Sequence, residues 1–243
     1  MSESRDDLFA ERLERIADFR FDEHVARVFP DMIGRSVPGY SSILASIELL
    51  AREYTLDDTR CYDLGCSLGA ATLAMRRGIG NRACSIVAID NAPAMAAGCK
   101  KSVTDDSNSA PVDVVCSDIF SVEINNASMV VLNFTLQFVP PELRSTLIQR
   151  IHDGLVPGGL LLLSEKLAFE DPVIDRLQIT MHHSFKRANG YSELEISQKR
   201  NALENVMVPE SLGVHRERLS RAGFSSAELW FQCFNFASLV AIK

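Results

Sequence analysis

The sequence lacks the features that mark several protein classes. It has no G-x-G-x-x-G dinucleotide fingerprint and no C-x-x-C pair, and its six cysteines are scattered, several of them within apolar stretches. Acidic residues outnumber basic ones, 32 against 25, and no apolar stretch is long enough to cross a bilayer. These absences argue against an NAD-dependent dehydrogenase, a zinc or other metal site, a disulfide scaffold, broad nucleic-acid binding and a membrane protein.

The remaining composition is that of an ordinary globular enzyme. With 243 residues, 47% of them hydrophobic and 23% charged, the chain is expected to form a single domain over 1–243. The charged start lacks the apolar run of a signal peptide, and the thiols are expected to be reduced, so we expect a cytoplasmic protein. We expect residues 1–20 to be flexible and residues 21–38 to be irregular, with several turns.

The chain is organised around residues 60–73, which predict a buried strand, a glycine turn and a helix. The strand ends in Asp63, and the spacing is D-x-G-x-x-x-G, with glycines at 65 and 69. Glycines let a ligand approach the backbone, and a helix N-terminus presents free N–H groups. An acid before the turn suits a ligand with hydroxyls or an ammonium group, such as S-adenosylmethionine (SAM). Another kind of doubly wound domain remains an alternative.

Two later strands also end in acids. The run 85–90 ends in Asp90, 25 residues after Gly65, the offset at which an acid meets ribose hydroxyls. Two carboxylate oxygens can accept both hydroxyl hydrogens, although Asp90 could instead cap a helix. The run 112–118 ends in Asp118, followed by Ile119, a pair that commonly holds the adenine in SAM enzymes. Three acids at one edge of a sheet form a stronger signal than any one of them.

The rest of the chain continues the α/β alternation. We expect a fourth strand ending at Asn133, a helix over 141–154, a fifth strand over 160–165 and a closing pair with its last strand antiparallel. The fold class is therefore α/β: a doubly wound, mostly parallel seven-stranded sheet of the Rossmann-like SAM-dependent methyltransferase type. Residues 171–205 interrupt the alternation, and we expect them to form a helical lid or a dimer contact.

Several side chains permit a functional and a structural interpretation. Tyr40, at the start of an amphipathic helix, either folds over a ligand or packs at the helix entry. The adjacent His182 and His183 point in different directions in a helix, which argues against a metal pair. Positive charges in the insertion are expected to be solvated or paired with neighbouring acids; they are Lys186, Arg187 and Lys199.

Five segments give a more specific resemblance. Over about 21–243 the chain resembles the carboxy-S-adenosylmethionine (carboxy-SAM) synthase family, and the polar segment that ends at Arg200 is the most telling. The matching segments are Val37–Tyr40, Tyr62–Thr72, Asn126–Phe138, Phe185–Arg200 and Glu228–Phe236.

The resemblance implies a transferase that does not transfer a methyl group. It would convert SAM and prephenate to carboxy-SAM and phenylpyruvate, and a partner enzyme would use the product to build 5-oxyacetyluridine at the wobble position of tRNA. This enzyme itself would contact neither nucleic acid nor membrane. A sulfonium stabilises negative charge on the adjacent carbon, so an ylide could trap the carbon dioxide released from prephenate if water is excluded.

The resemblance also implies a set of binding residues and a homodimer. Arg200 would hold the carboxylate of the product, as its planar cationic group suits bidentate binding, and it would come from the neighbouring subunit. We hypothesise that it selects carboxylated over plain SAM. The nucleoside pocket would be lined by Tyr40, Gly65, Cys66, Ser67, Asp90, Asn91, Asp118, Ile119 and Asn133.

Two rival functions share the same fold. The first is a SAM-dependent methyltransferase of a small molecule, which would not need an arginine facing the transferred carbon. The second is a non-catalytic SAM-binding partner of a tRNA-modifying enzyme. Fold alone does not choose among these.

Overall fold

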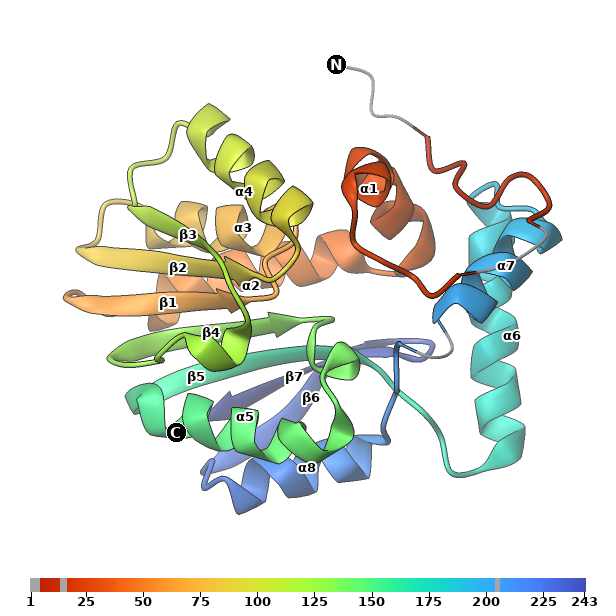
Figure 1. The fold of residues 1–243 in the computed structure, drawn as a ribbon. Coiled ribbons are helices and arrows are strands. Elements are labelled where there is room, and N and C mark those ends of the chain that lie inside the picture. The colour runs from red at the N-terminus through yellow and green to blue at the C-terminus, as the bar shows by residue number, and fades with distance from the viewer. Residues whose placement is uncertain (1–4, 14–16, 204–205) are drawn as a thin grey trace.

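A seven-stranded sheet forms the centre of the computed structural model, which describes residues 5–13, 17–203 and 206–243 (Figure 1). The strand order is β3-β2-β1-β4-β5-β7-β6. The first five strands are parallel, and β7 runs antiparallel between β5 and β6, which confirms the predicted fold class and closing strand pair. The strands are β1 (Thr59–Leu64), β2 (Cys84–Asp90), β3 (Val112–Cys116), β4 (Ala127–Asn133), β5 (Leu155–Lys166), β6 (Ser226–Cys233) and β7 (Phe236–Ile242).

Helices cover both faces of this sheet. One face packs against α2 (Tyr40–Tyr54), α3 (Ala70–Ile79) and α4 (Pro93–Asp105). The other face packs against α5 (Pro141–Gly154) and α8 (Leu212–Arg221). Because both faces are covered, the central strands read as continuous apolar runs.

The apolar side chains of strand β4 alternate between two hydrophobic clusters, one on each face of the sheet. Val130 and Leu132 pack in the cluster that contains α5 and α8, whereas Met129 and Val131 pack in the cluster that contains α2 and α3. All four side chains are fully buried. The strand ends at Asn133, which therefore lies at the carboxyl end of the parallel strands.

Helix α1 (Glu23–Ser36) shows that the prediction of irregular structure over 21–38 is wrong for most of that segment. The Asp22 side chain caps the helix by accepting from the N–H groups of His24 and Val25. Pro30 lies within the helix, although proline usually breaks one. Apolar packing outweighs that cost, because the buried face of α1 packs against Met95.

The segment after β5 forms two helices, α6 (Pro172–Ala188) and α7 (Glu193–Leu203), as predicted for the insertion, of which residues 204–205 lie outside the described residues. Together with α1 they stand at one end of the sheet, and the amino-terminal segment runs beside α7 (Figure 1). Asp6 of that segment is 2% exposed and accepts a hydrogen bond from Tyr191. No helix in the described ranges combines the length and apolar character needed to cross a bilayer.

Arg144, on α5, anchors the loop that follows β4. It is 1% exposed, its Nη1 lies 2.7 Å from Glu210 Oε2, and its other nitrogens donate to the carbonyls of Gln137 and Val139 at 3.1 and 2.8 Å. A buried guanidinium requires such partners, because an unpaired buried charge is costly. The loop therefore leaves β4 in a fixed direction.

We expect Arg144→Met to lower the free energy of unfolding by about 3–5 kcal/mol, since it removes the pair and leaves two buried carbonyls without their donor. Chemical denaturation of the purified variant measures the loss. Arg52→Met is the matched control, because Arg52 is half exposed on α2 in its pair with Glu48, and exposed pairs contribute about 0–1 kcal/mol. Equal losses in the two variants would contradict the anchoring role.

Candidate functional site

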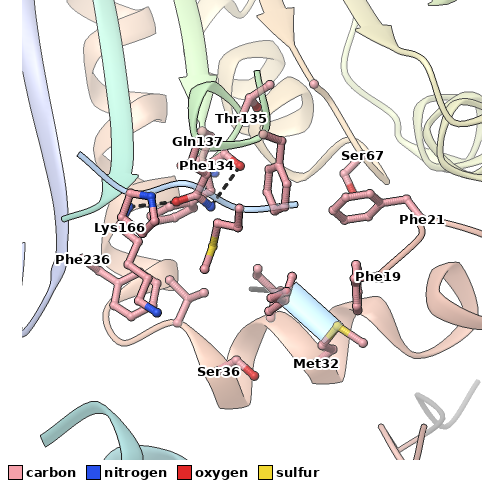
Figure 2. Close-up of a pocket in the computed structure, with 18 of the residues that line it drawn as sticks. Phe19, Phe21, Met32, Ser36, Ser67, Phe134, Thr135, Gln137, Lys166 and Phe236 are labelled. Atoms are coloured by element: carbon pink, nitrogen blue, oxygen red, sulfur yellow. Dashed lines mark hydrogen bonds between the residues drawn. The ribbon is translucent and has the colours of Figure 1, made fainter. Parts of the chain in front are cut away.

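A cavity of about 720 Å³ lies where the predicted site residues meet. Figure 2 shows aromatic rings of Phe19, Phe21 and Phe134 around it, with Met32 and Ser36 contributed by α1. The structure brings all ten predicted residues to this one cavity: Tyr40, Gly65, Cys66, Ser67, Asp90, Asn91, Asp118, Ile119, Asn133 and Arg200.

The cavity lies at the topological switch point of the sheet. Strand β1 has β2 on one side and β4 on the other, so the connections leave it in opposite directions. Ligands of doubly wound folds bind in the crevice outside the carboxyl ends of the strands at this point. Asp63 near the end of β1 and Asn133 at the end of β4 both line the cavity.

The turn after β1 is held by β2. The N–H groups of Gly65 and Cys66 donate to the carbonyl of Ile89 at 2.8 and 2.9 Å, and that of Ser67 donates to Asp90 Oδ2 at 2.8 Å. These three amides are therefore engaged within the protein. The turn therefore shapes the pocket, and these three amides are not available as donors to a ligand.

We expect Gly65→Ala to lower the free energy of unfolding by about 1–3 kcal/mol. Gly65 has φ +82°, and an added Cβ would lie 2.4 Å from Thr135 Oγ1. Thermal and chemical denaturation measure the loss. The control is Gly34→Ala in α1, where a Cβ meets nothing within 4 Å, and which should stabilise the helix. An unchanged free energy of unfolding for Gly65→Ala would show that the turn can relax to accept the added Cβ.

Asp90 is held by backbone donors and retains acceptor capacity. Its Oδ2 accepts from Ser67 and its Oδ1 accepts from the N–H of Ala92 at 2.9 Å. Ala92, and not Asp90, is the N-cap residue of α4, so the helix-cap interpretation is not what the structure shows. Burial raises the pKa of Asp90, which these backbone bonds oppose. A carboxylate has about four lone-pair positions, and two therefore remain for a ligand.

Two buried oxygen atoms in the cavity have no hydrogen-bond partner in the described part of the chain. Asp63 accepts from Thr72 Oγ1 at 2.5 Å through one oxygen, while its other oxygen and Asn133 Oδ1 are unpartnered. Burial raises the pKa of Asp63 to about 7, and the nearby charge of Asp90 adds to this effect. Buried acceptors without donors are costly, so they fit a ligand with an ammonium group or hydroxyls, as SAM has.

Aromatic rings form the wall beside these oxygens. The rings of Tyr40 and Phe134 lie 6.5 Å apart, and those of Phe134 and Phe236 lie 5.8 Å apart. Phe134 has a left-handed backbone with φ +64°, which is uncommon and strained for a bulky residue. Aromatic faces attract cations, and a sulfonium is one.

The expectation of solvated charges in the insertion is wrong for Lys186. It is 6% exposed and lines the cavity, as does Lys199, which is 4% exposed and pairs with Asp6 at 3.3 Å. Arg187 pairs with Glu193 on the surface, as expected. Lys186 lies four residues after His182, which is also buried, on the same face of α6. The described residues contain no cluster of metal ligands.

Known proteins share both the sequence and the fold. Residues 62–159 match the family described as "Methyltransferase domain". The chain is 60% identical over 244 residues to a protein of Geobacter sp. (strain M21), and 60% identical to one of Trichlorobacter lovleyi. Each match covers the whole of this chain and the whole of the relative. Both relatives are named carboxy-S-adenosyl-L-methionine synthase.

The chain belongs to the carboxy-S-adenosyl-L-methionine synthase family. A family member from Vibrio parahaemolyticus is 58% identical over 98% of this chain and 97% of its own length. Among solved structures, human N-acetylserotonin methyltransferase in complex with SAM is 20% identical, with a TM-score of 0.60 over 91% of this chain and 55% of that chain. Mycolic acid cyclopropane synthase CmaA1 is 16% identical, with a TM-score of 0.58 over 78% and 64%. This carboxy-SAM synthase family member thus has the general methyltransferase fold.

Proposed function

We propose that this protein converts SAM and prephenate to carboxy-SAM and phenylpyruvate. Membership in the carboxy-SAM synthase family supports this function, and so does the gathering of all ten expected residues at one cavity. This observation carries the proposal, because the residues come from separate elements that lie up to 160 positions apart in the chain. We place the activity in the cytoplasm, where SAM and tRNA are made.

The reaction balances without a further reactant. The carbon–carbon bond to the ring carboxylate of prephenate breaks, and its electron pair makes the ring aromatic and expels the ring hydroxyl. That hydroxide takes one proton from the methyl group of SAM and leaves as water. The electron pair of the broken C–H bond then forms the bond to carbon dioxide. The protein must exclude other water, which the aromatic wall of the cavity favours.

We assign the binding roles by the chemistry of each group. Asp90 accepts from the ribose hydroxyls, and Asp118 with Ile119 holds the adenine. The unpartnered oxygens of Asp63 and Asn133 accept from the ammonium end of SAM. Tyr40 covers the ligand from the start of α2.

Arg200 is proposed to hold the carboxylate that SAM gains. Its side chain is exposed on α7 and lines the mouth of the cavity of its own chain. The family resemblance implies an arginine donated by a neighbouring subunit. We propose a homodimer whose contact includes the exposed apolar residues of α6, among them Val173 at 72% and Leu177 at 52% exposure.

The product would serve a separate enzyme that completes 5-oxyacetyluridine in tRNA. The net charge of −7 supports a division of labour in which this protein handles only the small molecules. We propose that the protein itself makes no direct contact with nucleic acid.

Mass spectrometry tests the function. Protein purified without added ligand is denatured, and the released nucleoside is weighed; a species heavier than SAM by one carbon dioxide supports the proposal. Purified protein incubated with SAM and prephenate must then form carboxy-SAM and phenylpyruvate in equal amounts. Methylation of an added acceptor without any carboxylated product would favour a methyltransferase. Binding of SAM without turnover would favour the non-catalytic partner.

A further inference from the structure

The charged side chains that line the cavity are separated by sign. The acids lie at the ends of β1 and β2 and just after β3, whereas the basic groups come from β5 and the insertion that follows it. Figure 2 shows Lys166 and Phe236 on one side of the cavity and Ser67, Phe19 and Phe21 on the other. The basic side is made of Lys166, His182, His183, Lys186, Lys199 and Arg200.

Some of these basic groups already have partners. Lys199 Nζ lies 3.3 Å from Asp6 Oδ2 and 3.1 Å from Ser36 Oγ. His182 Nε2 lies 2.9 Å from the carbonyl of Ser36. These contacts fasten α7 and α6 to α1 and to the amino-terminal segment, so they have a structural role.

Lys186 has no such partner among the residues that the structure describes. Its side chain is buried, and no carboxylate in the described part of the chain lies within ion-pair distance of its ammonium. Its Nζ lies 5.7 Å from the centre of the Tyr191 ring. Lys166, at the end of β5, likewise has no ion pair among the described residues. Charging two buried or half-buried lysine amines without an anion within ion-pair distance is costly, so a bound anion would complete both groups and hold their protons.

We propose that Lys186, together with Lys166, binds the carboxylate of a 2-oxo acid, namely the one in the side chain of prephenate that phenylpyruvate retains. This inference rests on the proposed function. Of the two carboxylates of prephenate, the ring carboxylate must give up its charge as carbon dioxide, and an ion pair would stabilise it against that loss. The side-chain carboxylate keeps its charge throughout, so a lysine pair can hold it in substrate and product alike.

The wall beside the lysines suits the rest of such a molecule. Phe236 packs edge-on against His182, with ring centres 4.8 Å apart, and edge-on against Phe134, with ring centres 5.8 Å apart. The six-membered ring of prephenate would lie between this aromatic wall and the bound SAM, with its side-chain carboxylate toward Lys186. The ring carboxylate would then face the sulfonium end of the cavity, where the carbon dioxide is needed.

The first test separates binding from chemistry. Lys186→Met should raise the KM for prephenate and the Kd for phenylpyruvate at least tenfold. The value of kcat and the Kd for SAM should change by less than about threefold, because the contact is equal in ground and transition states. Lys101→Met is the control, since Lys101 is exposed on α4 and pairs with Asp105. Phenylacetone, which has the same ring and ketone but no carboxylate, should bind both proteins equally.

The second test measures the protons that are taken up when phenylpyruvate binds. Burial lowers the pKa of Lys186 to about 7, and the positive charges of Lys199 on α7 and Lys166 on β5 lower it further, while Asp6 opposes them. At pH 8 the free amine is therefore mostly neutral, and a bound carboxylate restores its proton. Calorimetry of phenylpyruvate binding in buffers of different ionisation enthalpy should show proton uptake in the wild type and none in Lys186→Met.

Stability supplies a check on folding. Lys186→Met removes a buried ammonium without a partner, so its Tm should equal or exceed that of the wild type, and a weaker affinity is then not the result of unfolding. Unchanged affinity for phenylpyruvate, or an equal loss for SAM, would overturn the inference. Wild-type protein that binds phenylpyruvate through Lys186 but makes no carboxy-SAM would overturn the proposed function alone.

Discussion

Asp90→Ala is expected to weaken the affinity for SAM about 100-fold, which corresponds to ~2.7 kcal/mol. The carboxylate would accept from both ribose hydroxyls, and hydrogen bonds to a charged group contribute about 1.5–3 kcal/mol each. Water that replaces the carboxylate in the variant recovers part of this binding free energy. Calorimetric titration of SAM into the variant measures the change directly.

Controls must separate the ligand contact from the local fold, because Asp90 also holds Ser67 and Ala92. Asp90→Asn keeps one oxygen acceptor and should weaken affinity by about tenfold, an intermediate value. Asp113→Ala removes an exposed acid from β3 and should leave SAM affinity unchanged. If Asp90→Ala binds SAM within about threefold of the wild type while Tm falls, Asp90 organises the turn and does not contact ribose.

The strand-end acids could be predicted from sequence because of the architecture that contains them. Parallel strands buried on both faces read as apolar runs, and their carboxyl ends meet at one edge. Asp63, Asp90 and Asp118 follow three such runs, and all three line the cavity. The apolar runs and the acids that end them were therefore sufficient to predict that these three residues, far apart in sequence, line one site.

Helix α1 could not be predicted in the same way. The segment around Pro30 carries the local chemistry of a turn, and only packing of its apolar face against Met95 makes the helix favourable. Tertiary packing thus outweighed a local signal. The error matters for the site, because α1 supplies Met32 and Ser36 to the cavity.

Lys186 was missed for a related reason. A lysine in a polar segment predicts a surface position, since lysine is rarely buried without a partner. Here Asp6 of the amino-terminal segment accepts from Tyr191 and Lys199, and the Tyr191 ring lies 5.7 Å from the ammonium of Lys186. The contact joins residues 185 or more positions apart, and no local pattern encodes it.

Arg200→Ala is expected to weaken the affinity for carboxy-SAM about 100-fold and to change that for SAM by less than twofold. Loss of one partner of a guanidinium–carboxylate pair costs about 2–5 kcal/mol, and SAM has no carboxylate on the transferred carbon. Parallel titrations with the two ligands measure the discrimination. Arg200→Lys keeps the charge but not the planar fork, and should recover only part of it. Arg187→Ala, which removes the exposed partner of Glu193, is the matched control. An equal loss of affinity for SAM and carboxy-SAM would show that Arg200 does not distinguish the two ligands by their carboxylate.

Mixed dimers then decide which chain supplies the arginine. Arg200→Ala and Asp90→Ala subunits, each of which binds carboxy-SAM weakly on its own, are unfolded together and refolded as a mixture. If Arg200 acts across the dimer, a mixed dimer has one site with both the intact Asp90 and the partner's arginine. About a quarter of all sites should then bind carboxy-SAM with wild-type affinity, because half of randomly paired dimers are mixed and each has one complete site of two. If Arg200 serves the cavity that it lines in its own chain, neither site of a mixed dimer is complete and no site regains wild-type affinity.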